Sequence, residues 1–185
     1  VRLVGSEMGR RDRGGGSRDM NEVQIQPFLN QVLVKCRARD IKVGLSSWYR
    51  QDVDDTRMKI TTPAEMARCW LKTLQSIEAD GLLDTVMFVD LCNEWPGNHW
   101  APYFASQYPQ VNWGQWNKDE SLVWMKAPLE IMRGEYPDMP FLFSFDNSEV
   151  EQYSETDTSF LDLYEHHIWM VQQNNSEFYK AVGYT

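Results

Sequence analysis

The sequence has few cysteines, no long apolar run and no excess of positive charge. Its three cysteines are an odd number, and none belongs to a CxxC motif, so neither a disulfide scaffold nor a structural zinc site is expected. The longest apolar runs, such as Val86–Val89, fall far short of the ~18 residues that cross a bilayer. We therefore expect free thiols, no cofactor, no metal and no membrane partner.

Asp and Glu outnumber Lys and Arg by 27 to 18, which gives the 185-residue chain a net charge of −9. This negative field repels phosphate, so a nucleic-acid partner is disfavoured. The Gly- and Arg-rich stretch 5–19 has neither GxGxxG nor GK[ST] spacing, so we interpret it as a solvated loop. The first residues lack a charged start followed by an apolar stretch, so we expect no signal peptide in this chain. Because Val1 is not a methionine, upstream processing or truncation stays open, and so does the compartment.

Expected strands alternate with expected helices along the chain. Thr62-Pro63-Ala64-Glu65 is a capping box with proline at the first helical position, and Val86–Cys92 has almost no polar alternation, as in a strand covered on both faces. Strands are expected at 1–4, 41–47, 86–92, 141–145 and 160–169, and helices at 21–40, 62–80, 117–136 and from 174. This order predicts one α/β domain over 1–185, with parallel strands joined by right-handed crossovers. Both an open doubly wound sheet and part of a (β/α)8 barrel fit it.

A carboxylate and an amide directly follow the buried strand 86–92, in the run Asn93-Glu94-Trp95-Pro96-Gly97. Function in parallel α/β folds gathers at the carboxyl ends of strands. Trp95 offers an apolar wall that raises the pKa of Glu94, as a general acid requires, and Asn93 can bind a substrate hydroxyl. The alternative is that the Asn-Glu pair only caps a helix.

Aromatic residues crowd the following loop, interleaved with Pro and Gly. They are Trp95, Trp100, Tyr103, Phe104, Tyr108, Trp113 and Trp116. Flat aromatic faces match the C–H faces of pyranose rings, so we expect the loop to bind sugar, with Trp95 and Trp100 among the contacts. A loop that packs only on itself is the alternative.

The run VDLCNEWPG at 89–97 resembles the acid/base motif that ends strand four in cellulase-like (β/α)8 glycoside hydrolases of clan A. The resemblance implies that Glu94 is the general acid/base and that Asn93 binds a substrate hydroxyl. The run LYEHHIW at 163–169 is similar to that clan's strand six and implies that His167 and Trp169 lie near the nucleophile. The chain therefore looks like strands two to six of a partial TIM barrel.

Two further matches to this clan are weaker. Arg2, in a strand similar to strand two, would support the nucleophilic carboxylate, and Trp48 falls where strand three presents an aromatic ring to substrate. Alternatively, Arg2 is a surface or ion-paired arginine, Trp48 packs at a strand end, and His167 is a core histidine bonded to backbone. Asp90 shares strand parity with Glu94. It therefore either points into the barrel, where Arg2 could pair with it, or has a role outside the barrel.

The resemblance implies a retaining glycoside hydrolase that acts on a β-linked oligo- or polysaccharide, in an extracellular or periplasmic setting. The clan places its nucleophile at the end of strand seven, and no carboxylate up to Thr185 matches that position. We therefore expect the 185 residues alone to be inactive, because a retaining site needs two carboxylates. A non-catalytic carbohydrate-binding remnant is the main alternative. A Ser-His-Asp esterase is a weaker one, since the chain has no GxSxG elbow.

Overall fold

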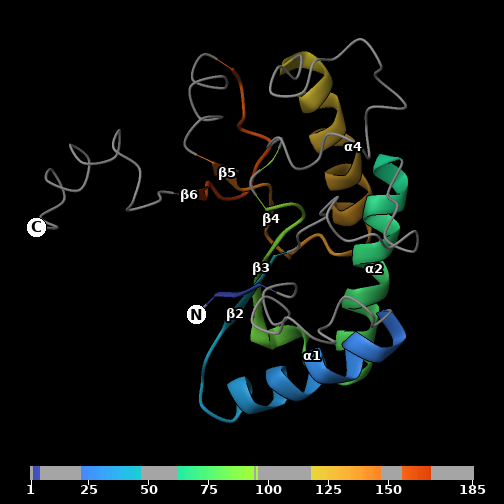
Figure 1. Ribbon diagram of the computed structural model, residues 1–185, viewed down its shortest axis with the longest axis vertical. Helices are drawn as coiled ribbons and strands as arrows, with labels where there is room; N and C mark the ends of the chain where they lie inside the picture. The colour runs from blue at the N-terminus through green and yellow to red at the C-terminus, as the bar shows by residue number, and fades with distance from the viewer. Residues whose placement is uncertain are drawn as a thin grey trace, which may run out of the picture.

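The computed structural model describes residues 2–4, 22–46, 62–93, 95, 118–146 and 156–167. Its elements are β1 (Arg2–Val4), α1 (Glu22–Arg37), β2 (Val43–Ser46), α2 (Pro63–Ala79), the 3-10 helix η4 (Leu83–Thr85), β3 (Val86–Asp90), α4 (Lys118–Glu135), β4 (Phe141–Leu142), β5 (Phe145–Asp146) and β6 (His166–His167). Strands β1 to β4 pair in that order in one parallel sheet, and β5 and β6 form a second parallel pair (Figure 1). The expected α/β fold with parallel strands and crossover helices is confirmed.

Helix α2 forms as its local signals predict. Thr62 Oγ1 accepts from the Glu65 backbone N–H at 3.1 Å, and Glu65 Oε2 accepts from the Thr62 N–H at 3.1 Å. The helix ends at Ala79 with Asp80 as its C-cap, and Gly81 then adopts φ +65°, a left-handed conformation that glycine takes without a Cβ clash. No helix in the described part of the chain is long and apolar enough to cross a membrane.

The sheet has one apolar face, which packs on the helices, and one face of mixed character. Helices α2 and α4 lie side by side (Figure 1). The buried core joins their apolar stripes to one row of strand residues, namely Val43, Leu45, Val89, Leu91, Phe141 and Phe143. Because strand residues alternate between faces, the intervening positions Gly44, Ser46, Phe88, Asp90 and Leu142 belong to the other face.

Gly44 and Phe88 are partners in adjacent strands on that second face. A Cβ added to Gly44 would lie 2.3 Å from Cζ of the Phe88 ring, far inside the ordinary contact distance of about 3.5–4.0 Å between carbon atoms. The ring therefore lies over the bare Cα of position 44, and glycine is required there by close approach.

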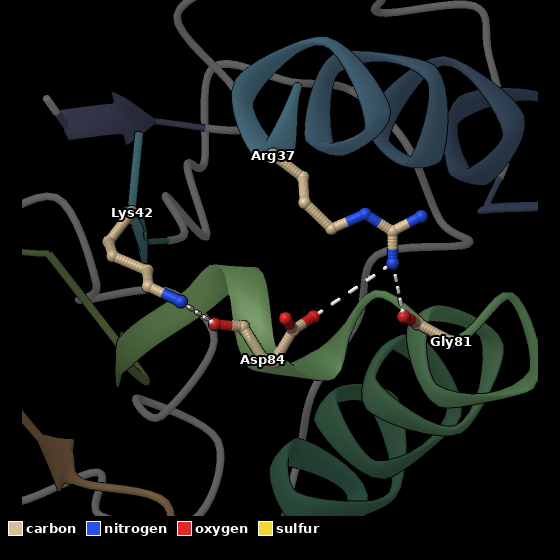
Figure 2. Close-up of polar contacts among 4 residues, drawn as sticks. All are labelled: Arg37, Lys42, Gly81 and Asp84. Atoms are coloured by element: carbon tan, nitrogen blue, oxygen red, sulfur yellow. Dashed lines mark hydrogen bonds and ion pairs between the residues drawn. The ribbon is translucent and has the colours of Figure 1, made fainter. Parts of the chain in front are cut away.

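Polar contacts hold the chain together near the amino ends of β2 and β3 (Figure 2). Arg37, the last residue of α1, donates to the Gly81 carbonyl at 2.6 Å and lies 4.0 Å from the Asp84 carboxylate, while Lys42 donates to the Asp84 carbonyl at 2.5 Å. Because both side chains of the ion pair are exposed, we expect the pair itself to contribute little stability. Together, the contacts of Arg37 and Lys42 hold the end of α1 against the turn between α2 and β3.

Two expected strands differ from the structure. The strand expected at 141–145 is divided into β4 and β5, which belong to different sheets. Between them, the Ser144 N–H donates to the Asp90 carboxylate instead of to a neighbouring strand. The strand expected at 160–169 is reduced to His166–His167 within the described residues, because residues before it form a turn and Asp162 caps β4 by accepting from the Phe141 N–H at 2.8 Å. The helix expected from 174 lies outside the described residues.

Candidate functional site

A buried carboxylate, Asp90, joins three segments of the chain at the carboxyl ends of the strands. Its Oδ2 accepts from Ser46 Oγ of β2 at 2.6 Å and from Ser144 Oγ at 2.7 Å. Its Oδ1 accepts from the Ser144 backbone N–H at 2.9 Å. We call Ser46, Asp90 and Ser144 the Asp90 cluster. All three residues are buried, and Asp90 is 0% exposed, so the cluster fixes the ends of β2 and β3 against the segment between β4 and β5.

Burial raises the pKa of the Asp90 carboxyl, and the negative charge of Glu165 raises it further. The hydrogen bonds from Ser46 and Ser144 lower the pKa, but burial is the larger effect. Each serine hydroxyl can either donate or accept a hydrogen bond. The cluster can therefore hold Asp90 as a carboxylate or as a neutral acid without losing its contacts.

The segment that follows β3 is held at several points. The Leu91 N–H donates to the Leu142 carbonyl at 2.8 Å, and the Trp95 N–H donates to the Ser144 carbonyl at 2.8 Å. Asn93, the expected hydroxyl-binding amide, is 1% exposed. Glu94 itself lies outside the described residues. The residues on both sides of it are nevertheless placed at the carboxyl end of β3, next to the Asp90 cluster.

The Trp95 ring lies in the hydrophobic core. It is 0% exposed, and its centroid is 6.2 Å from that of Trp124 and 5.4 Å from that of Phe143, with tilted planes. A ring with no exposed surface offers no face on which a sugar could stack. In this structure Trp95 is thus a packing residue, which differs from its expected contact with substrate, because α4 and residue 143 supply an apolar site for it.

Most other expected site residues are not described. Trp48, Trp100 and Trp169 lie outside the described residues. Only the main chain is described at Arg2, which is the register partner of Gly44, and at His167, which is the partner of Asp146. Their side-chain roles, including the expected pairing of Arg2 with Asp90, stay predictions.

The sequence interpretation missed Ser46 and Ser144 as partners of Asp90. The available signal was parity: Ser46 alternates with Leu45 at the end of β2, and Ser144 alternates with Phe143 beyond β4. A small hydroxyl residue at each neighbouring strand end can satisfy a buried carboxylate. Among the described residues, no group of His, Cys, Asp and Glu is arranged to hold a metal ion.

The sequence matches a family model described as sugar-binding cellulase-like over residues 3–185. The chain belongs to this cellulase-like family. It is also similar to the crystal structure of a proposed glycoside hydrolase from Parabacteroides distasonis, with 67% identity over 92% of this chain and a TM-score of 0.73. The chain spans 45% of that protein's length. No curated protein matches it. The resemblance to cellulase-like proteins is confirmed.

Proposed function

We propose that this cellulase-like chain is part of a retaining glycoside hydrolase that cleaves β-linked oligo- or polysaccharides, with Glu94 as the general acid/base. One observation carries the proposal. In a member of the cellulase-like family, Asn93 and Trp95 lie just past the end of strand β3, and the Trp95 N–H donates to the Ser144 carbonyl. This is the edge of a parallel sheet where α/β enzymes carry their chemistry.

The proposed reaction uses Glu94 twice. Glu94 first protonates the glycosidic oxygen while a second carboxylate, about 5–5.5 Å away, attacks the anomeric carbon. Glu94 then deprotonates the water that releases the sugar. None of the chain's carboxylates is assigned as the nucleophile. The parallel order of β1 to β4, with α2 and α4 packed on one face, supports a partial (β/α)8 barrel as the scaffold.

The remaining expected residues keep their proposed roles around this acid. Asn93 would bind a sugar hydroxyl, and Arg2 would support the nucleophile. The rings that would contact the substrate are those of Trp48, Trp100, His167 and Trp169. The buried position of the Trp95 ring supports a different part for that residue, which is to anchor the chain beside Glu94.

The test is Glu94→Gln in the protein that contains this chain, assayed on aryl β-glycosides, soluble β-glucan and mannan. General acid/base groups contribute about 10²–10⁴-fold to rate, so we expect a loss of that order with oligosaccharide binding retained, because the amide keeps the shape of the side chain. Glu130→Gln is the matched control, since Glu130 is exposed on α4. Wild-type rates in Glu94→Gln would contradict the assignment.

A second candidate is carbohydrate binding without catalysis, which the description of the family as sugar-binding favours. In that case an oligosaccharide would change the tryptophan fluorescence through Trp100, Trp113 or Trp116, and alanine at one of them would weaken binding by about tenfold, or ~1.4 kcal/mol. Binding to the same panel of glycans without any turnover would favour this candidate over the hydrolase.

A further inference from the structure

A chain of hydrogen bonds leads from the Asp90 carboxylate to the peptide next to Glu94. Asp90 Oδ1 accepts from the Ser144 N–H at 2.9 Å, and the carbonyl of the same residue, Ser144, accepts from the Trp95 N–H at 2.8 Å. That N–H belongs to the peptide bond between Glu94 and Trp95. The position of this peptide is therefore connected to Asp90 through one residue.

Both ends of this connection are fixed within the fold. Asp90 lies in β3 between two neighbours, with Ser46 Oγ 2.6 Å and Ser144 Oγ 2.7 Å from its Oδ2. At the other end, the Trp95 ring is enclosed by Trp124 and Phe143. A peptide tied at its N–H and followed by a buried ring has little freedom to rotate, which is what a general acid needs from its support.

We propose that Asp90 is a positioning residue for Glu94, acting through the main chain of Ser144. The inference rests on the proposed function of Glu94 as the acid, and it adds a role for a buried carboxylate that would not contact the substrate. Misplacing a reacting group by about 1 Å can cost about 10²-fold in rate, so a shift of the peptide after Glu94 would be visible in kinetics.

The informative comparison is Asp90→Ala against Asp90→Asn. Alanine leaves the Ser144 N–H without its acceptor. Asparagine keeps an oxygen for that N–H, and its amide group can donate to the hydroxyls of Ser46 and Ser144, which both accept as well as donate. The control for a general loss of stability is Asn30→Ala, which breaks a separate contact from the buried Asn30 Nδ2 to the exposed Asp80 carboxylate at 2.6 Å.

The readout is the dependence of kcat/KM on the leaving group, measured with phenyl and dinitrophenyl β-glycosides of the sugar accepted by the wild-type protein. Phenolate is a poor leaving group and needs the acid, whereas dinitrophenolate leaves without it. We expect Asp90→Ala to lower kcat/KM by about 10–100-fold for the phenyl glycoside and to change it little for the dinitrophenyl glycoside. Asp90→Asn and Asn30→Ala should keep the wild-type ratio of the two values.

Equal losses on both substrates, or the same ratio in Asp90→Ala as in Asn30→Ala, would overturn the inference. Glu94→Gln separates the two proposals. If it retains the phenyl glycoside activity, the proposed function fails. If it loses that activity selectively while Asp90→Ala does not, only the positioning role fails.

Should Asp90→Ala not fold, the triple variant Ser46→Ala/Asp90→Leu/Ser144→Ala replaces all three polar side chains by apolar ones. This avoids stranding the serine hydroxyls and still removes the Asp90 acceptor from the residue-144 N–H. The same selective loss on the phenyl glycoside supports the positioning role in this variant, and a wild-type ratio overturns it.

Discussion

Replacing Gly44 by alanine tests whether the second face of the sheet is packed as described. The new Cβ would lie 2.3 Å from Cζ and 2.7 Å from each Cε of Phe88, so the ring must retreat by more than about 1 Å to reach an ordinary carbon contact. The two residues are register partners in adjacent strands, which limits that retreat. Overpacking of this kind costs about 1–3 kcal/mol, and we expect the upper half of that range, or a fall in Tm of about 4–12 °C.

Urea unfolding of four proteins measures this effect: wild type, Gly44→Ala, Phe88→Leu and the double variant. The clash requires the ring, so the alanine should cost less in the Phe88→Leu background, with a coupling energy of at least about 1 kcal/mol. Gly134→Ala is the matched control, because a Cβ there meets nothing within 4 Å and alanine favours a helix by about 0.5–1 kcal/mol. Additive effects of Gly44→Ala and Phe88→Leu would refute the close approach.

Two further predictions concern Tyr136 and Trp95. Burial and the Glu78 carboxylate, which accepts from Tyr136 Oη at 2.9 Å, raise the pKa of Tyr136 to about 12. The folded state holds this proton more tightly than the unfolded state, so the stabilisation is complete below about pH 10 and is lost as the pH rises towards 12. Tyr136→Phe should lessen that loss of stability, which urea midpoints measured from pH 9 to 12 would show. Trp95→Ala should cost about 3–5 kcal/mol in the same unfolding assay, while Trp95→Phe leaves oligosaccharide affinity unchanged; weaker sugar binding at wild-type stability would show a ring that contacts substrate.

Helix α2 was predictable because its signals are local. Thr62, Pro63 and Glu65 define the start within one turn, and Gly81 marks the end. Each contact joins residues close in the sequence, so the spacing alone specifies it. Parallel strands were predictable for a related reason, because strands separated by helices need crossovers.

The divided strand at 141–145 depends on contacts from far along the chain. Its apolar run FLFSF fits one continuous strand. In the folded chain, Ser144 bonds to Asp90, 54 residues away, and the Phe141 N–H bonds to Asp162, 21 residues away. A distant carboxylate that replaces a strand neighbour leaves no mark in the periodicity of the run itself.

The candidate site was predictable in place and less so in detail. Strand parity correctly allowed Asp90 to face away from the helices, but its partners Ser46 and Ser144 are 44 and 54 residues away. The sequence also could not distinguish a Trp95 ring that lines a sugar site from one that fills a core. That difference depends on Trp124 and Phe143, which only the folded chain brings to it.

The enclosed ring of Trp95 is adjacent in the sequence to Glu94, the proposed acid. Substitutions at these two neighbouring positions are therefore expected to be selected against for different reasons. In a library of single substitutions, changes at 95 would reduce the amount of folded protein in the cell, since the ring is 0% exposed and its loss opens a cavity. If Glu94 is the acid proposed above, changes at 94 would leave abundance intact and remove only turnover. A screen that scores activity alone would merge the two positions, whereas one that also scores protein level would separate them.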